Sequence, residues 1–125
     1  MRMGGYPSKV RSLAFLSGGQ LMATSGAQGA VLWPFTGANG PMGREATEIG
    51  YDEGSLVTLV AGNPKQGVMA AGLSDGRVWW ADPAGQGLNF LKAERGPPIA
   101  ALAMSPNGQR VAWADEDGNA GVAEA

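Results

Sequence analysis

Short apolar runs recur along the chain in three similar copies. The copies begin at Val10, Leu56 and Ile99, so 46 and then 43 residues separate their starts. Further apolar residues stand three and five positions after each start, at Leu13 and Phe15, Leu59 and Ala61, and Leu102 and Met104. Short apolar runs bounded by turn residues are typical of β-strands. The pattern therefore predicts the first strand of each of three repeated units.

A turn and a second strand follow in every copy. The turns are rich in Gly, Pro, Asn and Ser, which either tolerate a positive φ or pre-set a turn, and they span Ser17–Gly19, Asn63–Gly67 and Ser105–Gly108. The second turn has a single-residue insertion in this alignment. The strands expected after these turns are rich in small residues and cover Leu21–Ser25, Val68–Gly72 and Val111–Ala114.

A hairpin then leads to a third strand. The dipeptides at this point are Gln28-Gly29, Asp75-Gly76 and Asp117-Gly118. Asp-Gly between two strands is a strong hairpin signal, because the tight turn needs backbone that accepts a positive φ. The third strands end four residues after each glycine, at Trp33, Trp80 and Val122. We take the glycines and tryptophans at these places as structural repeat positions.

Two further segments, Glu45–Ile49 and Leu88–Lys92, are candidates for a fourth and outermost strand. A four-stranded antiparallel unit that recurs every 43 to 46 residues is typical of a β-propeller blade. A β-sandwich has strands at similar spacing but needs no long period. We therefore expect an all-β chain forming one domain over residues 1–125, built of propeller blades with repeats at about 9–36, 47–82 and 88–124.

The chain resembles the WD40 family. The residues that carry the resemblance are Ser105-Pro106-Asn107-Gly108, Asp75-Gly76 with Trp80, and Gln28-Gly29 with Trp33. Two stretches, Tyr6–Leu13 and Val31–Phe35, look like the carboxy-terminal part of bacterial WD40 proteins of unassigned role. The Gly-His pair of the family is absent, and Pro34 and Ala81 stand where the family has Asp. The resemblance implies a protein-interaction scaffold, since propellers present rims and a central surface to partners.

The amino-acid composition limits the kinds of catalytic and binding site that the chain can form. The chain has 21 Gly and 8 Pro, but its 44% of hydrophobic residues lie in regularly spaced runs, so frequent turns explain these counts better than disorder. With no Cys and no His, thiolate nucleophiles, imidazole bases and zinc sites that need sulfur or nitrogen ligands are excluded. A net charge of −2 without a basic run argues against nucleic acid. No apolar run is long enough for a signal peptide or a membrane span, so we expect a cytoplasmic protein. We expect no cofactor.

Carboxylates gather where the WD40 arrangement places loops on a single rim. They are Asp52, Glu53, Asp75, Asp115, Glu116 and Asp117. Such a rim would attract a basic protein partner or hold a weak oxygen-ligated cation. The structural alternative is that Asp simply makes these turns. Paired carboxylates also serve in glycoside hydrolysis, but without a nucleophile motif or a phosphate-binding loop we expect no enzyme.

Four tryptophans have both a structural and a functional interpretation. Trp33, Trp79, Trp80 and Trp113 could anchor an interface, yet each blade of a propeller is covered on both faces by its neighbours. We therefore expect packing between sheets, above all for Trp33 and Trp80. The glycine-rich stretch Gly37–Pro41 is expected to be a loop.

Three blades cannot close a ring, which typically needs four to eight. The third copy has no fourth strand of its own, and the only candidate donor, Met1–Ser8, is a poor strand on propensity. The chain is thus expected to be the carboxy-terminal portion of a longer propeller, or to form a two-fold dimer with six blades. The functional expectation is a scaffold; the alternatives are a self-assembling structural module and a small-ligand-binding or enzymatic propeller.

Overall fold

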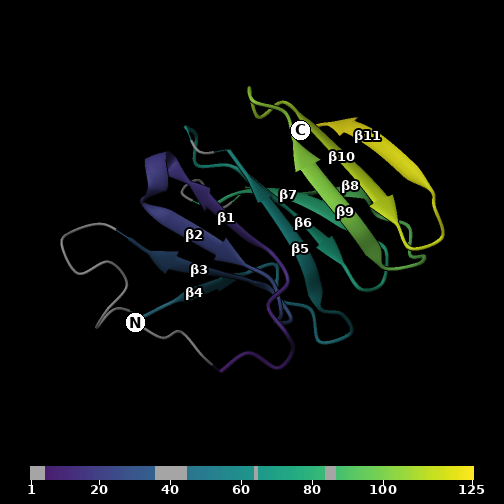
Figure 1. The fold of residues 1–125 in the computed structure, drawn as a ribbon, viewed down its shortest axis with the longest axis horizontal. Helices are drawn as coiled ribbons and strands as arrows, with labels where there is room; N and C mark the ends of the chain where they lie inside the picture. Colours follow the sequence, from purple (N-terminus) through teal and green to yellow (C-terminus); the bar gives the residue numbers. More distant parts are fainter. Residues whose placement is uncertain (1–4, 36–44, 64, 84–86) are drawn as a thin grey trace.

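The computed structural model describes residues 5–35, 45–63, 65–83 and 87–125. Within these ranges the chain forms three antiparallel sheets, which follow one another in sequence order (Figure 1). The first sheet contains β1 (Leu13–Leu16), β2 (Leu21–Thr24), β3 (Ala30–Pro34) and β4 (Thr47–Ile49). The second contains β5 (Val57–Gly62), β6 (Met69–Leu73), β7 (Val78–Asp82) and β8 (Gly87–Lys92). The third contains β9 (Ile99–Met104), β10 (Arg110–Asp115) and β11 (Ala120–Glu124).

Each sheet is an up-and-down meander, as the repeat predicts. The three expected strands of every copy pair in chain order, and the expected fourth strands are confirmed as β4 and β8, which pair with β3 and β7. β4 therefore belongs to the first sheet, although it stands at the start of the second sequence repeat, 47–82. The expected loop Gly37–Pro41, and residues Met1–Gly4 of the candidate donor strand, lie outside the described residues.

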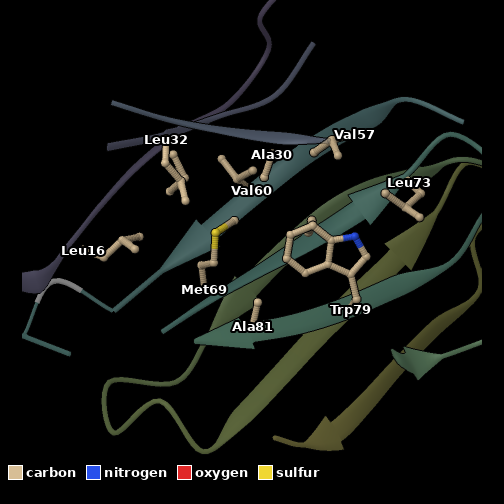
Figure 2. Packing of buried hydrophobic residues seen from close by; sticks show 11 residues of the cluster. Leu16, Ala30, Leu32, Val57, Val60, Met69, Leu73, Trp79 and Ala81 are labelled. Atoms are coloured by element: carbon tan, nitrogen blue, oxygen red, sulfur yellow. The ribbon is translucent and has the colours of Figure 1, made fainter. Parts of the chain in front are cut away.

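The second sheet is buried on both faces. One apolar cluster joins it to the first sheet, and Figure 2 shows Met69 and Trp79 of the second sheet directed toward Leu16 and Leu32 of the first. A second cluster joins it to the third sheet, where Val78 packs with residues of β9 and β10. A sheet covered on both sides has strands that are apolar throughout rather than alternating. All five residues of β6 are accordingly buried.

Glycine allows the third sheet to approach the second closely. A Cβ built on Gly72 of β6 would lie 2.5 Å from Cγ2 of Ile99 on β9, which is too close for two carbon atoms. Ile99 itself is buried. The small residue in the middle of β6 is therefore a requirement of sheet-on-sheet packing.

The hairpin prediction is confirmed at two of the three glycines. Gly76 and Gly118 both have φ of +87°, each following a hydrogen-bonded turn at the end of a strand. Gly29 is different, because the left-handed glycine of the first hairpin is Gly26, with φ of +100°. Paired residues Thr24 and Val31 enclose a loop one residue longer than the loop between Gly72 and Val78. The extra residue moves the left-handed position.

The expected alignment of the first strands is one residue out of phase. Gly62 pairs with Met69, and Met104 pairs with Val111, so Gly62 rather than Ala61 is equivalent to Met104. The turns after these strands have equal length, since Asn63 N donates to Val68 O and Ser105 N to Arg110 O. The expected insertion in the second turn is therefore wrong. A strand with apolar residues on both faces carries no alternation that would fix its phase.

The tryptophans divide between the faces of the sheets. Trp79, and not Trp33 or Trp80, is the fully buried one, at 1% exposure. Trp80 is half-buried against the cluster between the second and third sheets, as expected. The expected packing of Trp33 between sheets is wrong, because Trp33 pairs with Met22, which pairs with Phe15, on the outer face of the first sheet. Its indole Nε1 donates to Tyr6 Oη at 2.7 Å.

We expect Trp79→Ala to lower the free energy of unfolding by about 3 to 5 kcal/mol, because it empties a fully buried aromatic site. Trp80→Ala should cost less, since its ring is partly solvated in the folded state. Urea unfolding of both variants, followed by circular dichroism, measures the two losses. A loss for Trp80→Ala equal to or larger than that for Trp79→Ala would contradict this assignment of the core.

Candidate functional site

The loops at one end of the stack are joined by backbone hydrogen bonds into a continuous rim. Asp52 N donates to Gln28 O, and Ser74 N donates to Leu56 O, so the loop before β5 contacts the hairpins of the first two sheets. In the same way the loop before β9 contacts the hairpins of the second and third sheets. Gly96 N donates to Asp75 O at 2.7 Å and Glu116 N to Pro98 O at 3.0 Å. The candidate acidic residues all lie on these loops.

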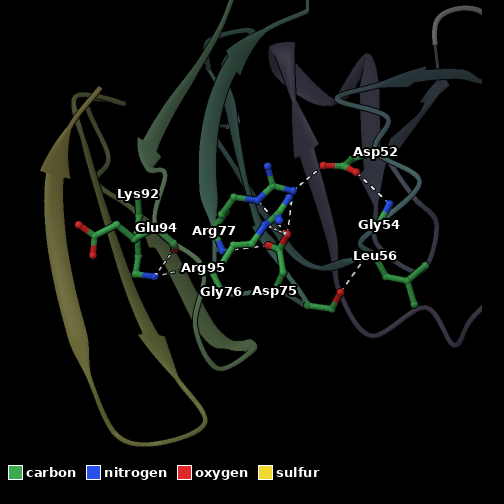
Figure 3. A network of polar contacts seen from close by, with 10 residues as sticks. Asp52, Gly54, Leu56, Asp75, Gly76, Arg77, Lys92, Glu94 and Arg95 are labelled. Atoms are coloured by element: carbon green, nitrogen blue, oxygen red, sulfur yellow. Dashed lines mark hydrogen bonds and ion pairs between the residues drawn. The ribbon is translucent and has the colours of Figure 1, made fainter.

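Arg77 brings two of the candidate carboxylates together (Figure 3). Its Nε donates to Asp75 Oδ2 at 2.8 Å, and its second terminal nitrogen contacts Asp52 Oδ2. Asp52 lies in the loop before β5 and Asp75 in the β6–β7 hairpin, so this guanidinium ties two separate loops. Arg95 adds an ion pair to Asp75 at 3.4 Å from the next loop. The carboxylates of Asp52 and Asp75 are thus neutralised within the protein.

A lysine completes this network. Lys92 Nζ donates to the carbonyl oxygens of Gly76 and Glu94, at 2.7 and 2.8 Å. Within the β6–β7 hairpin Arg77 binds the carboxylate of Asp75, and Lys92 of β8 binds the carbonyl oxygen of Gly76. Arg77 also lies over the ring of Phe90 on β8, with its Cζ 5.2 Å from the ring centroid, a cation–π distance.

The same hydrogen bonds shift the pKa values of Asp52 and Arg77. The hydrogen bond from Arg77 is the main cause that lowers the pKa of Asp52, and the backbone N–H of Gly54 adds to it. The hydrogen bond to Asp75, followed by that to Asp52, raises the pKa of Arg77. Both pKa shifts favour the charged forms, so Asp52 and Arg77 form a pair of opposite charges.

The third hairpin presents its carboxylates differently. Asp115 is buried, and its Oδ1 accepts hydrogen bonds from the backbone N–H groups of Asp117 and Asn119, at 3.0 and 2.9 Å. The bond from Asn119 is the main cause that lowers the pKa of Asp115. Asp115 therefore closes the turn, as the structural alternative predicts. Glu116 and Asp117 are exposed on the same turn.

The sequence correctly predicts where the acidic residues lie, but it does not predict the basic residues that pair with them. All six candidate carboxylates lie on the connected loops, and Glu53 is exposed like Glu116 and Asp117. The basic residues Arg77, Lys92 and Arg95, which sequence reasoning missed, lie among them. Arg77 directly follows the Asp-Gly pair, and that adjacency is the signal available in the sequence. Among the described residues no group of three acidic side chains is arranged to hold a metal ion.

Comparison with known proteins adds no family. No family model matches the chain, and no curated protein matches it. Over the described part of the chain, no helix has the length and apolar character that crossing a membrane requires.

We expect Arg77→Ala to lower the free energy of unfolding by about 1 to 3 kcal/mol, because it leaves two carboxylates without their shared partner. The matched control is Arg95→Ala: that side chain is 70% exposed against 13% for Arg77, so its loss should change stability by less than about 0.5 kcal/mol. Denaturant titration of both variants tests this. Equal effects would mean that Arg77 does not tie the loops together.

The lowered pKa of Asp115 predicts a loss of stability in acid. A carboxyl group whose pKa is lower in the folded than in the unfolded state stabilises the fold at pH values above its unfolded-state pKa. This contribution disappears as the pH falls through the folded-state pKa. The free energy of unfolding should thus fall below about pH 4, and fall less steeply in Asp115→Asn. Asp117→Asn, an exposed control on the same turn, should keep the wild-type slope. Thermal unfolding across this pH range distinguishes these outcomes, and identical slopes in both variants would contradict the prediction.

Proposed function

We propose that the three sheets are consecutive β-propeller blades of the WD40 type, and that the chain is a non-catalytic protein-interaction scaffold. The observation that carries the proposal is the stack itself, in which the second sheet is covered on both faces by the sheets before and after it. Meanders stacked face to face in chain order, with hairpins and connecting loops along one rim, are the repeating unit of a propeller.

The rim is the proposed partner surface. Its carboxylates fall into two groups, those bound within the protein and those exposed to solvent. Asp52, Asp75 and Asp115 hold the loops in place, whereas Glu53, Glu116 and Asp117 are free to face a partner. Exposed carboxylates on a fixed backbone favour a protein with a basic surface, because charge of one sign accelerates encounter with the opposite sign.

A self-assembling structural module is the second candidate function. It is favoured by the exposure of large apolar side chains on the outer sheets, namely Leu13 at 60%, Phe15 at 48% and Val122 at 67%. Contiguous apolar surface on a folded protein marks an interaction site.

The rim proposal predicts salt-dependent capture that depends on Glu116 and Asp117. The double variant Glu116→Gln/Asp117→Asn should slow association with a captured partner several-fold at low salt, and reduce the dependence of the rate on salt. Partners are captured from a lysate on the immobilised chain, and association rates are then measured by surface plasmon resonance over a salt series.

The control for this experiment is Glu45→Gln/Glu48→Gln. It removes the same charge from exposed positions at or next to β4 in the first sheet, whereas Glu116 and Asp117 lie in the hairpin of the third sheet, and it should leave the rates unchanged. If the rim variant and this control behaved alike, the exposed carboxylates would serve only the turns.

A further inference from the structure

The two faces of every sheet are unlike, and they are unlike in the same way. We call the face toward the preceding sheet in the chain the leading face, and the opposite one the trailing face. The centre of each trailing face is a cross-strand pair of alanines. These pairs are Ala14 with Ala23, Ala61 with Ala70, and Ala103 with Ala112.

Each leading face carries large side chains and one tryptophan, and the trailing face of the second sheet also carries Trp80 beside its alanine pair. The second sheet presents Met69 and Trp79, and the third presents Val111 and Trp113. On the first sheet the leading face carries Met22, which is equivalent to Met69 and Val111, and Trp33, which pairs with Met22 as Ala81 pairs with Met69. Facing layers interdigitate when large residues of one meet small residues of the other.

Both interfaces inside the chain follow this rule. Between the first and second sheets, Met69 and Trp79 belong to the same cluster as Ala23, with Ala14 packed against it. Between the second and third sheets, Val111 clusters with Ala70, and Trp113 packs against them. A trailing face with alanines at its centre is thus covered each time by a leading face with large residues.

In the described part of the chain, the same two kinds of face expose apolar side chains at the two ends of the stack. The trailing face of the third sheet exposes Ala101, Ala103 and Val122. The leading face of the first sheet exposes Leu13 and Phe15, and the Phe15 ring packs edge-on against Phe35 at a centroid distance of 5.5 Å. Tyr6 contacts Trp33 on this face through a hydrogen bond, whereas Leu13 and Phe15 of β1 are exposed.

We infer that the trailing face of the third sheet docks on the leading face of the first sheet of a second copy of this chain. The contact places Leu13 and Phe15 of one copy over the alanine pair Ala103 and Ala112 of the other, and so continues the rule of the two internal interfaces. Because the two surfaces differ, the contact is heterologous, and two copies close a ring only if each provides both surfaces. The inference extends the proposed propeller arrangement and is independent of whether the rim binds a partner.

Light scattering on the purified chain over a range of concentrations, together with two charge variants, tests the docking. Ala112→Arg blocks the trailing face and Leu13→Arg blocks the leading face. Each variant alone should weaken self-association tenfold or more. An equimolar mixture of the two should recover dimer, because the intact trailing face of the Leu13→Arg copy can dock on the intact leading face of the Ala112→Arg copy. Gln109→Arg, an exposed position in the β9–β10 turn, is the matched control and should associate as the wild type does.

Three results would overturn the inference. A wild-type chain that is monomeric at every concentration rules out the docking, while leaving the salt dependence of rim binding as a separate result. Disruption by Ala112→Arg alone indicates a symmetric contact between two trailing faces, and failure of the mixture to recover dimer excludes a heterologous contact. Larger open assemblies of the wild type support the docking without ring closure. Melting curves establish that the variants fold, and Ala103→Lys probes the same face if Ala112→Arg does not.

Discussion

The burial of the second sheet on both faces holds the rest of the molecule together. An antiparallel sheet alone has one face that water can solvate and one that needs cover, whereas this sheet has apolar side chains on both. Glycine brings both neighbours close: a Cβ on Gly62 would lie 2.6 Å from Leu16 Cδ2, and one on Gly72 would lie 2.5 Å from Ile99 Cγ2. The first and third sheets are therefore fixed relative to each other through the sheet between them.

This stacking also determines the rim. Because successive sheets lie face to face, each connecting loop runs between two hairpins and bonds to both, as Asp75 O and Gly96 N do. Arg77 then meets carboxylates from two loops that are distant in sequence. The acidic residues accordingly divide by their contacts: Asp52, Asp75 and Asp115 are hydrogen-bonded within the loops, and the exposed Glu53, Glu116 and Asp117 have charge available to a partner. A count of carboxylates on the rim would overstate its field, since paired charges largely cancel.

The sequence predicts the order and pairing of the strands well, because turn residues and apolar runs act locally. It predicts the hairpin glycines where the loops are equal in length, at Gly76 and Gly118, and fails at Gly29, where the loop is longer. The phase of β5 and the depth of Trp79 depend on which neighbouring sheet each face meets, and a strand that is apolar on both faces carries no record of that. The pairing of Arg77 with Asp52 joins two loops in space, so spacing along the chain gives no indication of it.

Because the two faces of each sheet differ, the stack has a leading end and a trailing end, and within the described ranges each end has an apolar face without a neighbouring sheet of this chain. A repeat whose trailing face fits the leading face of the next can add units without limit unless the ends meet or are covered. The first sheet is partly covered, because Tyr6 lies at Trp33 and its hydroxyl bonds both the Trp33 indole and Thr24 Oγ1. The buried indole nitrogens of Trp79 and Trp80, in contrast, have no protein partner in the described structure. Tyr6 thus satisfies the polar group of this end and leaves its most apolar part, around β1, as the surface that gains most free energy from being covered.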